Sequence, residues 1–135
     1  MSLSTEDALV YVMVVTASSD AGISDRELRL IGSLIERAPA LEGFVLDRLE
    51  SVANACVDKL NGTTGLDGVL DMAVAAIPKR LQDTAYALAV EVAVVDLQLP
   101  QEELRLLEMI RDRLDVDRLV TAAIEAAARA RMRKA

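Results

Sequence analysis

The sequence predicts an all-α protein, a single-domain bundle of about seven helices. The chain has 135 residues, which is a usual size for one domain. It is 53% hydrophobic but has only three aromatic residues and six glycines, so its core must consist of Leu, Val, Ile, Ala and Met. Alanine and leucine favour helix, and no segment shows the sustained alternation of a strand. We therefore expect residues 1–135 to form one helical domain.

The first two helices are delimited by capping residues. Ser4 is a suitable N-cap with Asp7 three residues later, and residues 8–15 are apolar on every side, as in a buried helix. Ser24 and Glu27 have the spacing of a capping box. The seven expected helices cover residues 4–18, 24–37, 41–60, 66–76, 78–95, 100–114 and 115–135.

Turn residues separate the later helices. Asn61 and Gly62 end the third helix, and residues 61–65 have the composition of a connector. Pro78 and Pro100 suit the first turns of the fifth and sixth helices, because proline lacks the N–H that the first turn does not use. Asp115 is expected to cap the seventh helix.

The second half of the chain repeats the first. Residues 20–31 align with residues 96–107, an offset of 76, and both segments contain an Asp followed by an aliphatic residue and a Glu-Leu-Arg-Leu sequence. The two copies cover about residues 4–36 and 79–114. Such a duplication predicts a pseudo-two-fold arrangement, with the first and fifth helices side by side at the centre.

This repeated motif resembles the tellurite-resistance TerB-like family, in which a helix ending in Asp-Gly, an aliphatic residue, Ser or Pro, and a following Glu occurs twice in an all-helical domain. The resemblance covers most of the chain. It implies that the acidic residues of the two copies form a divalent-cation site, here Asp20, Glu27, Asp96 and Glu103. It also implies a role in tellurite resistance or in the response to metal or oxidative stress. Pro100 fits the family pattern, whereas Gln98 replaces the usual glycine.

The chemistry of these residues favours a hard cation. Four carboxylates suit Ca²⁺ better than Mg²⁺ or Mn²⁺, because Ca²⁺ accepts six to eight oxygens in irregular geometry. Zinc is not expected, since the chain has no histidine and one cysteine. The motif is not an EF-hand, because Ile31 occupies the position of the bidentate glutamate. No organic cofactor is expected either, since no nucleotide-binding motif occurs.

An alternative interpretation assigns these acids a structural role only. Glu27 and Glu103 lie where glutamates complete capping boxes or complement the helix dipole, and Asp20 and Asp96 lie in turns, where aspartate is common. The protein would then be an interaction module or a homo-oligomer. A protein partner or a homodimer is compatible with the sequence, but no residue identifies one.

Composition excludes several functions. The net charge of −7 and the lack of stacking aromatic residues disfavour nucleic-acid binding. Without histidine, a nucleophile motif or a cofactor motif, we expect no enzyme activity. Residues 8–15 form the longest apolar run, which is too short to span a bilayer, and the N-terminal region lacks the features of a signal peptide, so we expect a cytoplasmic protein.

The four positive charges near the C-terminus are the one basic cluster in the sequence. They are Arg129, Arg131, Arg133 and Lys134, and the rest of the chain has 11 basic and 22 acidic residues, a net charge of −11. We expect these cations to complement the negative end of a helix. Weak peripheral contact with anionic lipid is the alternative.

Overall fold

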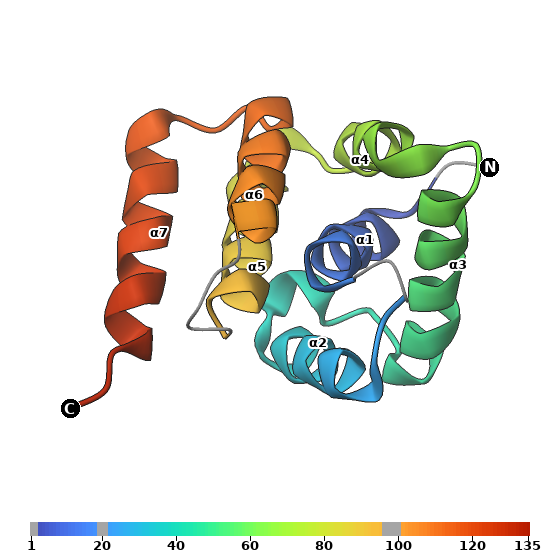
Figure 1. Ribbon diagram of the computed structural model, residues 1–135, viewed down its shortest axis with the longest axis horizontal. Helices are drawn as coiled ribbons and strands as arrows, with labels where there is room; N and C mark the ends of the chain where they lie inside the picture. The colour runs from blue at the N-terminus through green and yellow to red at the C-terminus, as the bar shows by residue number, and fades with distance from the viewer. Residues whose placement is uncertain (1–2, 19–21, 96–100) are drawn as a thin grey trace.

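A computed structural model describes residues 3–18, 22–95 and 101–135, with the backbone alone for residues 101–103. The described residues form seven α-helices, which confirms the all-α class (Figure 1). The helices are α1 (Thr5–Ala17), α2 (Asp25–Arg37), α3 (Leu49–Asn61), α4 (Gly65–Ala75), α5 (Gln82–Val94), α6 (Gln101–Arg113) and α7 (Arg118–Met132). Three short 3₁₀ turns are η1 (Pro39–Leu41), η2 (Leu46–Arg48) and η3 (Lys79–Leu81).

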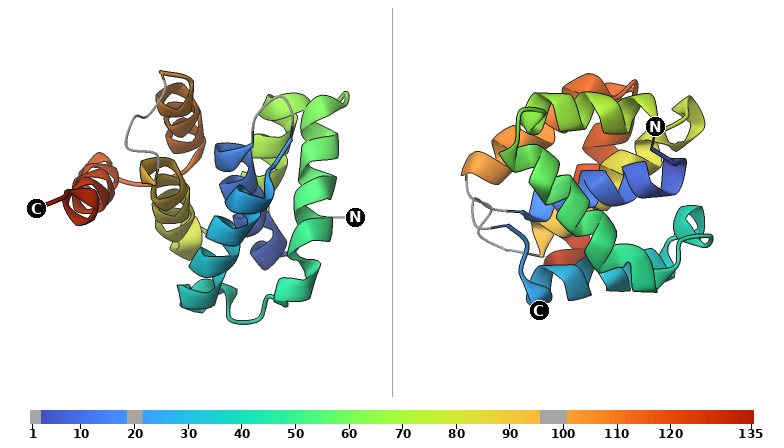
Figure 2. Two further views of the ribbon diagram at one scale, coloured as in Figure 1. Left: turned by 60° about the horizontal axis from the view of Figure 1, so that its bottom comes forward. Right: turned by 90° about the vertical axis from the view of Figure 1, so that its right-hand side faces the viewer.

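Helix α1 lies at the centre of the bundle. Every residue from 8 to 15 is at most 3% exposed, as the unbroken apolar sequence predicted. Helices α3, α4 and α5 pack against it, and α3 crosses in front of it when the molecule is viewed from the side (Figures 1 and 2). The prediction that the first and fifth helices lie side by side is therefore confirmed. The two predicted copies fold as the pairs α1–α2 and α5–α6.

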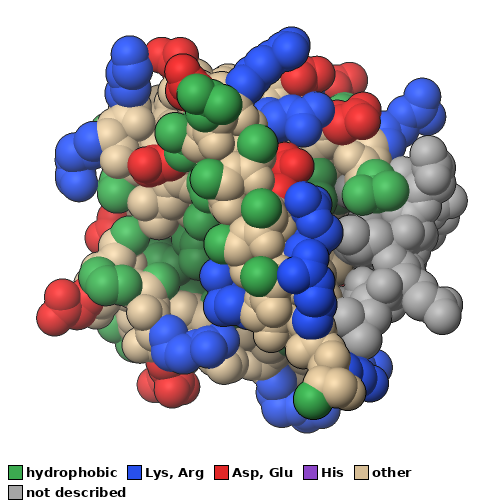
Figure 3. Space-filling view, turned by 90° about the vertical axis from the view of Figure 1, so that its left-hand side faces the viewer, with side chains coloured by type: hydrophobic (Ala, Val, Ile, Leu, Met, Phe, Trp, Pro, Cys, Tyr) green, Lys and Arg blue, Asp and Glu red, His purple; other side chains and the backbone are tan. Residues whose placement is uncertain are grey.

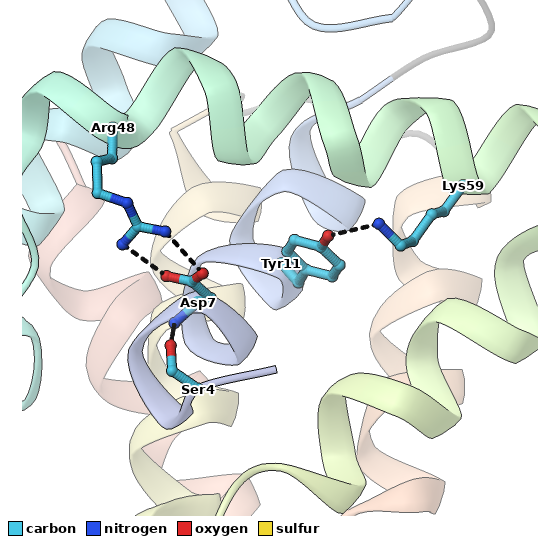
Figure 4. A network of polar contacts seen from close by, with 5 residues as sticks. All are labelled: Ser4, Asp7, Tyr11, Arg48 and Lys59. Carbon is cyan, nitrogen blue, oxygen red and sulfur yellow. Dashed lines mark hydrogen bonds and ion pairs between the residues drawn. The ribbon is translucent and has the colours of Figure 1, made fainter. Parts of the chain in front are cut away.

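Two polar contacts attach α1 to the two ends of α3, one from the first turn of α1 and one from its middle (Figure 4). Arg48, at the start of α3, donates from both terminal nitrogens to the two carboxylate oxygens of Asp7, at 3.1 and 2.9 Å. Lys59, in the last turn of α3, donates to the hydroxyl of Tyr11 at 3.1 Å. Because the Asp7 backbone N–H also donates to Ser4 Oγ at 3.1 Å, the expected N-cap of α1 is confirmed.

Three predicted helix boundaries are wrong. The third helix begins at Leu49 and not at residue 41, because the chain after α2 makes η1 and η2, whose turn buries Leu41 and Phe44 against the core. The fifth begins at Gln82, since Pro78 is extended (ψ 153°) and is followed by η3. The seventh is capped by Asp117, whose carboxylate accepts from the Leu119 N–H at 2.7 Å.

Asp115, the expected cap of the last helix, has different partners. Its backbone N–H donates to Gln82 Oε1 at 2.6 Å, and its carboxylate forms an exposed ion pair with Lys79 at 3.2 Å. The residue therefore fixes the link between α6 and α7 to the start of α5. It does not cap the helix, because α7 begins three residues later, at Arg118, with Asp117 as its N-cap.

Helix α7 forms one edge of the molecule and packs mainly on α5 (Figures 1 and 2). Its buried residues are Thr121 and Ala128, and Arg131 forms an ion pair with Glu91 of α5. Among the described residues, no helix is long and apolar enough to cross a membrane.

Candidate functional site

The structure locates one of the four predicted carboxylate side chains. Asp20 and Asp96 lie outside the described residues, and Glu103 belongs to α6 without a described side chain. Glu27 is in the first turn of α2 and is partly exposed. We therefore locate the predicted site from the helices that surround Glu27.

A hollow of about 390 Å³ lies beside Glu27, and we name it the α1–α5 hollow. It is lined by Thr16 and Ala17 of α1, by Ser24, Arg26, Glu27 and Leu30 at the start of α2, and by Val92 and Val95 at the end of α5. The C-terminal ends of α1 and α5 thus lie at the same end of the bundle, next to the N-terminal end of α2. Both predicted copies contribute to this place.

Glu27 is held in a complete capping box. Its Oε1 accepts from the Ser24 N–H at 2.8 Å, and Ser24 Oγ accepts from the Glu27 N–H at 3.2 Å. Glu27 therefore has the capping role that the alternative interpretation assigns to it. A capping carboxylate keeps lone pairs on its second oxygen, so the cap does not exclude ligation.

Other acidic side chains do not complete a metal site in the described part of the chain. Among residues 3–18, 22–95 and 104–135, no group of three or more Asp, Glu or Cys side chains is arranged to hold a metal ion. The described side chains around Glu27 are apolar, hydroxylic or, in Arg26, cationic. Further anionic ligands at the hollow would have to come from outside this described set.

A second polar cluster, which the sequence did not predict, joins α5, α6 and α7. The Tyr86 hydroxyl donates to Glu125 Oε2 at 2.5 Å, and Arg111 Nη1 approaches the same oxygen at 3.4 Å. Tyr86 is only 1% exposed. Burial raises the pKa of Tyr86 most, and the hydrogen bond to Glu125 raises it further. The nearby Arg111 lowers it.

This cluster borders a groove of about 640 Å³ between α5, α6 and α7. Val90, Val94, Leu104 and Leu107 form its apolar side. Sequence reasoning missed the cluster because its three residues come from three helices without a motif. One signal was present, since Tyr86 is one of only two tyrosines and lies in a stretch, residues 85–95, that is otherwise apolar except for Glu91.

Cys56 is not part of a reactive site. It is fully buried in α3, and burial raises its pKa to about 12 despite the nearby Lys59. A thiol that stays protonated at neutral pH is a poor nucleophile and a poor reductant.

Fold and site together define a small all-α domain with a polar hollow where its central helices end. Comparisons with protein-family models, with curated proteins and with solved structures give no match.

Proposed function

We propose that this protein binds a divalent cation, Ca²⁺ in preference to Mg²⁺ or Mn²⁺, at the α1–α5 hollow through Glu27, Asp20, Asp96 and Glu103. The proposed cellular role is that of the TerB-like proteins it resembles, in tellurite resistance or in the response to metal or oxidative stress. One observation carries the proposal: the C-terminal ends of α1 and α5 and the first turn of α2 line one hollow.

Chain connectivity supports the participation of both aspartates. Asp96 directly follows Val95, which lines the hollow, and Asp20 is three residues beyond Ala17, which also lines it. Three residues of chain span at most about 11 Å. The positions of both aspartates in the sequence, close to residues that line the hollow, support the proposal.

Helix dipoles at the hollow act in both directions. The C-terminal ends of α1 and α5 present carbonyl oxygens and partial negative charge, which favour a cation. The N-terminal end of α2 and the guanidinium of Arg26 oppose it. A cation there needs several carboxylates, which is consistent with an acidic residue at each of the four motif positions.

In this proposal the protein is a non-catalytic, cytoplasmic binding protein that does not contact nucleic acid. The net charge of −7 and the absence of histidine from the sequence support this part of the proposal. Cys56, which is fully buried, supports a role in binding rather than in the direct reduction of tellurite.

Thermal unfolding of chelator-treated protein in the presence of Ca²⁺, Mg²⁺ or Mn²⁺ tests the proposal. A ligand at about 100 times its Kd stabilises the native state by about 2.7 kcal/mol. In a domain of this size, each kcal/mol raises Tm by roughly 2–8 °C. We expect a saturable rise for the wild type, largest with Ca²⁺, and none for Asp20→Asn/Asp96→Asn.

The matched control is Asp47→Asn/Asp58→Asn, which removes the same two charges from exposed positions of η2 and α3. This variant should respond to Ca²⁺ as the wild type does. A flat response of the wild type to all three ions would refute the cation site and leave the acids as caps and turns.

A further inference from the structure

Helix α7 has an apolar outer face that no other part of the described chain covers. Its members are Leu119, Val120, Ala122, Ala123, Ala126, Ala127 and Ala130, all of them exposed. Leu119 is 81% exposed, more than any other large hydrophobic residue described. At 3.6 residues per turn, these positions fall within an arc of about 160° that contains no acidic side chain. Figure 3 shows hydrophobic side chains along this face and a column of Lys and Arg beside it.

The inner side of α7 is apolar as well. Thr121 and Ala128 are buried and Ile124 packs against the core, so the helix has apolar residues on both of its sides. A helix that buries one face usually presents polar residues on the opposite face, and α7 does not. Contiguous exposed apolar surface marks an interaction site. The outer face therefore has the character of an interface.

The geometry points to a second copy of this chain as the occupant. We propose that two copies associate through the outer faces of α7, with the two helices antiparallel around a two-fold axis near Ala123 and Ala126. In this arrangement Ala123 of one copy lies opposite Ala126 of the other, and each Leu119 lies opposite an Ala130. A large residue against a small one at each end, and small residues at the centre, allow close approach of the helices.

Charge selects the antiparallel orientation. Asp112, Asp115 and Asp117 lie near the N-terminal end of α7 in the sequence, but Arg111, Arg113 and Arg118 balance their charge, and Asp115 also pairs with Lys79. The C-terminal end has Arg129, Arg131, Arg133 and Lys134. Parallel packing would bring the two basic ends together, whereas antiparallel packing places each basic end beside an N-terminal end whose charges are balanced. The helix dipoles favour the same orientation.

A membrane surface fits this face less well. Helices that lie on a bilayer insert bulky Leu, Phe or Trp side chains, whereas five of the seven outer residues here are alanine. The chain outside the basic cluster has a net charge of −11, which an anionic surface would repel. Alanine suits the close packing of two helices.

The short length of α7 limits the expected affinity of the dimer. A 15-residue helix is about 22 Å long, so one helix pair buries less area than a standard interface of about 1,600 Å². We expect a reversible dimer with a Kd on the order of 1–100 µM, near the weak end of specific complexes.

Sedimentation equilibrium of the full chain in chelator, over concentrations of about 1–500 µM around that Kd, is the first test. The wild type should convert from monomer to dimer. Ala126→Glu, which places two like charges at the two-fold axis, should raise the Kd by at least about tenfold. The matched control, Asn54→Glu, adds the same charge on the exposed side of α3 and should dimerise like the wild type. Circular dichroism should show that all three proteins are folded.

Disulfide trapping tests the orientation, in a Cys56→Ala background. In the antiparallel dimer the two Leu119 positions are about 16 Å apart, too far for a disulfide. A mixture of Leu119→Cys and Ala130→Cys chains should therefore cross-link, and Leu119→Cys alone should not. A wild type that stays monomeric throughout, or Leu119→Cys chains that cross-link alone as fast as the mixture, would overturn the proposal.

This inference does not depend on the cation site. No residue of α7 lines the α1–α5 hollow, and the dimer is measured in chelator. Failure of one proposal therefore leaves the other intact.

Discussion

The hydroxyl of Tyr86 and the carboxylate of Glu125 form a hydrogen bond of 2.5 Å that fastens α7 to the body of the protein. Arg111 reaches the same carboxylate oxygen at 3.4 Å and adds α6 to the contact. The remainder of the α5–α7 contact includes few large side chains, since the two buried residues of α7 are Thr121 and Ala128. This cluster and the Arg131–Glu91 ion pair are therefore directional contacts that position the last helix.

Tyr86→Phe should destabilise the protein. The substitution removes the donor and leaves a partly buried carboxylate with Arg111 alone, which costs about 1–3 kcal/mol in comparable cases. Urea unfolding followed by circular dichroism measures the loss. Glu125→Gln is the control, because an amide oxygen still accepts from the tyrosine, and its loss should be smaller. Equal stability of Tyr86→Phe and the wild type would show that the hydrogen bond contributes nothing.

The same contact predicts a loss of stability at high pH. Burial and Glu125 raise the pKa of Tyr86 above its usual value of 10.0 in the folded state. Below pH 10 the group is protonated in both states and its full contribution is present. As pH rises beyond 10, the unfolded chain releases the proton first, so stability falls until the folded pKa is passed. The difference in unfolding free energy between the wild type and Tyr86→Phe should shrink over this interval, and a constant difference from pH 8 to about 11 would contradict the assignment.

Cys56 should react only when the protein opens. Burial raises the pKa of the Cys56 thiol from 9.0 to about 12, so at pH 8 almost none of this thiol is ionised in the native protein. The side chain is also fully buried, so a reagent cannot reach it. A thiol reagent such as Ellman's should label native protein at the rate of unfolding, and urea-unfolded protein at once. Above pH 9 the unfolded chain ionises first, which lowers stability. Rapid stoichiometric labelling of native protein would refute the burial.

Local patterns predicted more of this molecule than long-range ones. The apolar segment 8–15 identified the central helix, and Ser4, Ser24 and Glu27 form the predicted caps, because these features depend only on neighbours in the chain. The third helix was predicted eight residues too early, since tertiary burial of Phe44 favours two 3₁₀ turns where the sequence also allows helix.

The same difference between local and long-range features applies to the candidate site. The repeat predicted that the first and fifth helices lie together, and their ends do line one hollow. Tyr86, Arg111 and Glu125 could not be predicted as a cluster, because their proximity depends on how three helices pack. The carboxylates Asp20, Asp96 and Glu103 stay a prediction.

Two substitutions in α2 separate a capping role from a ligating role. Ser24→Ala removes the acceptor of the Glu27 N–H and should cost about 1 kcal/mol with or without Ca²⁺. Glu27→Gln keeps an oxygen for the Ser24 N–H, so in chelator its stability should lie close to that of the wild type. The amide has lost the charge, however, and amide oxygens bind Ca²⁺ less strongly than carboxylates.

If Glu27 ligates, the Ca²⁺-dependent rise in Tm should therefore shrink in Glu27→Gln and persist in Ser24→Ala. Thermal unfolding of the wild type and both variants, in chelator and at saturating Ca²⁺, measures these rises. An undiminished rise in Glu27→Gln would restrict this residue to its capping box. The ligands would then have to be sought among Asp20, Asp96 and Glu103, because those are the other carboxylates of the repeated motif.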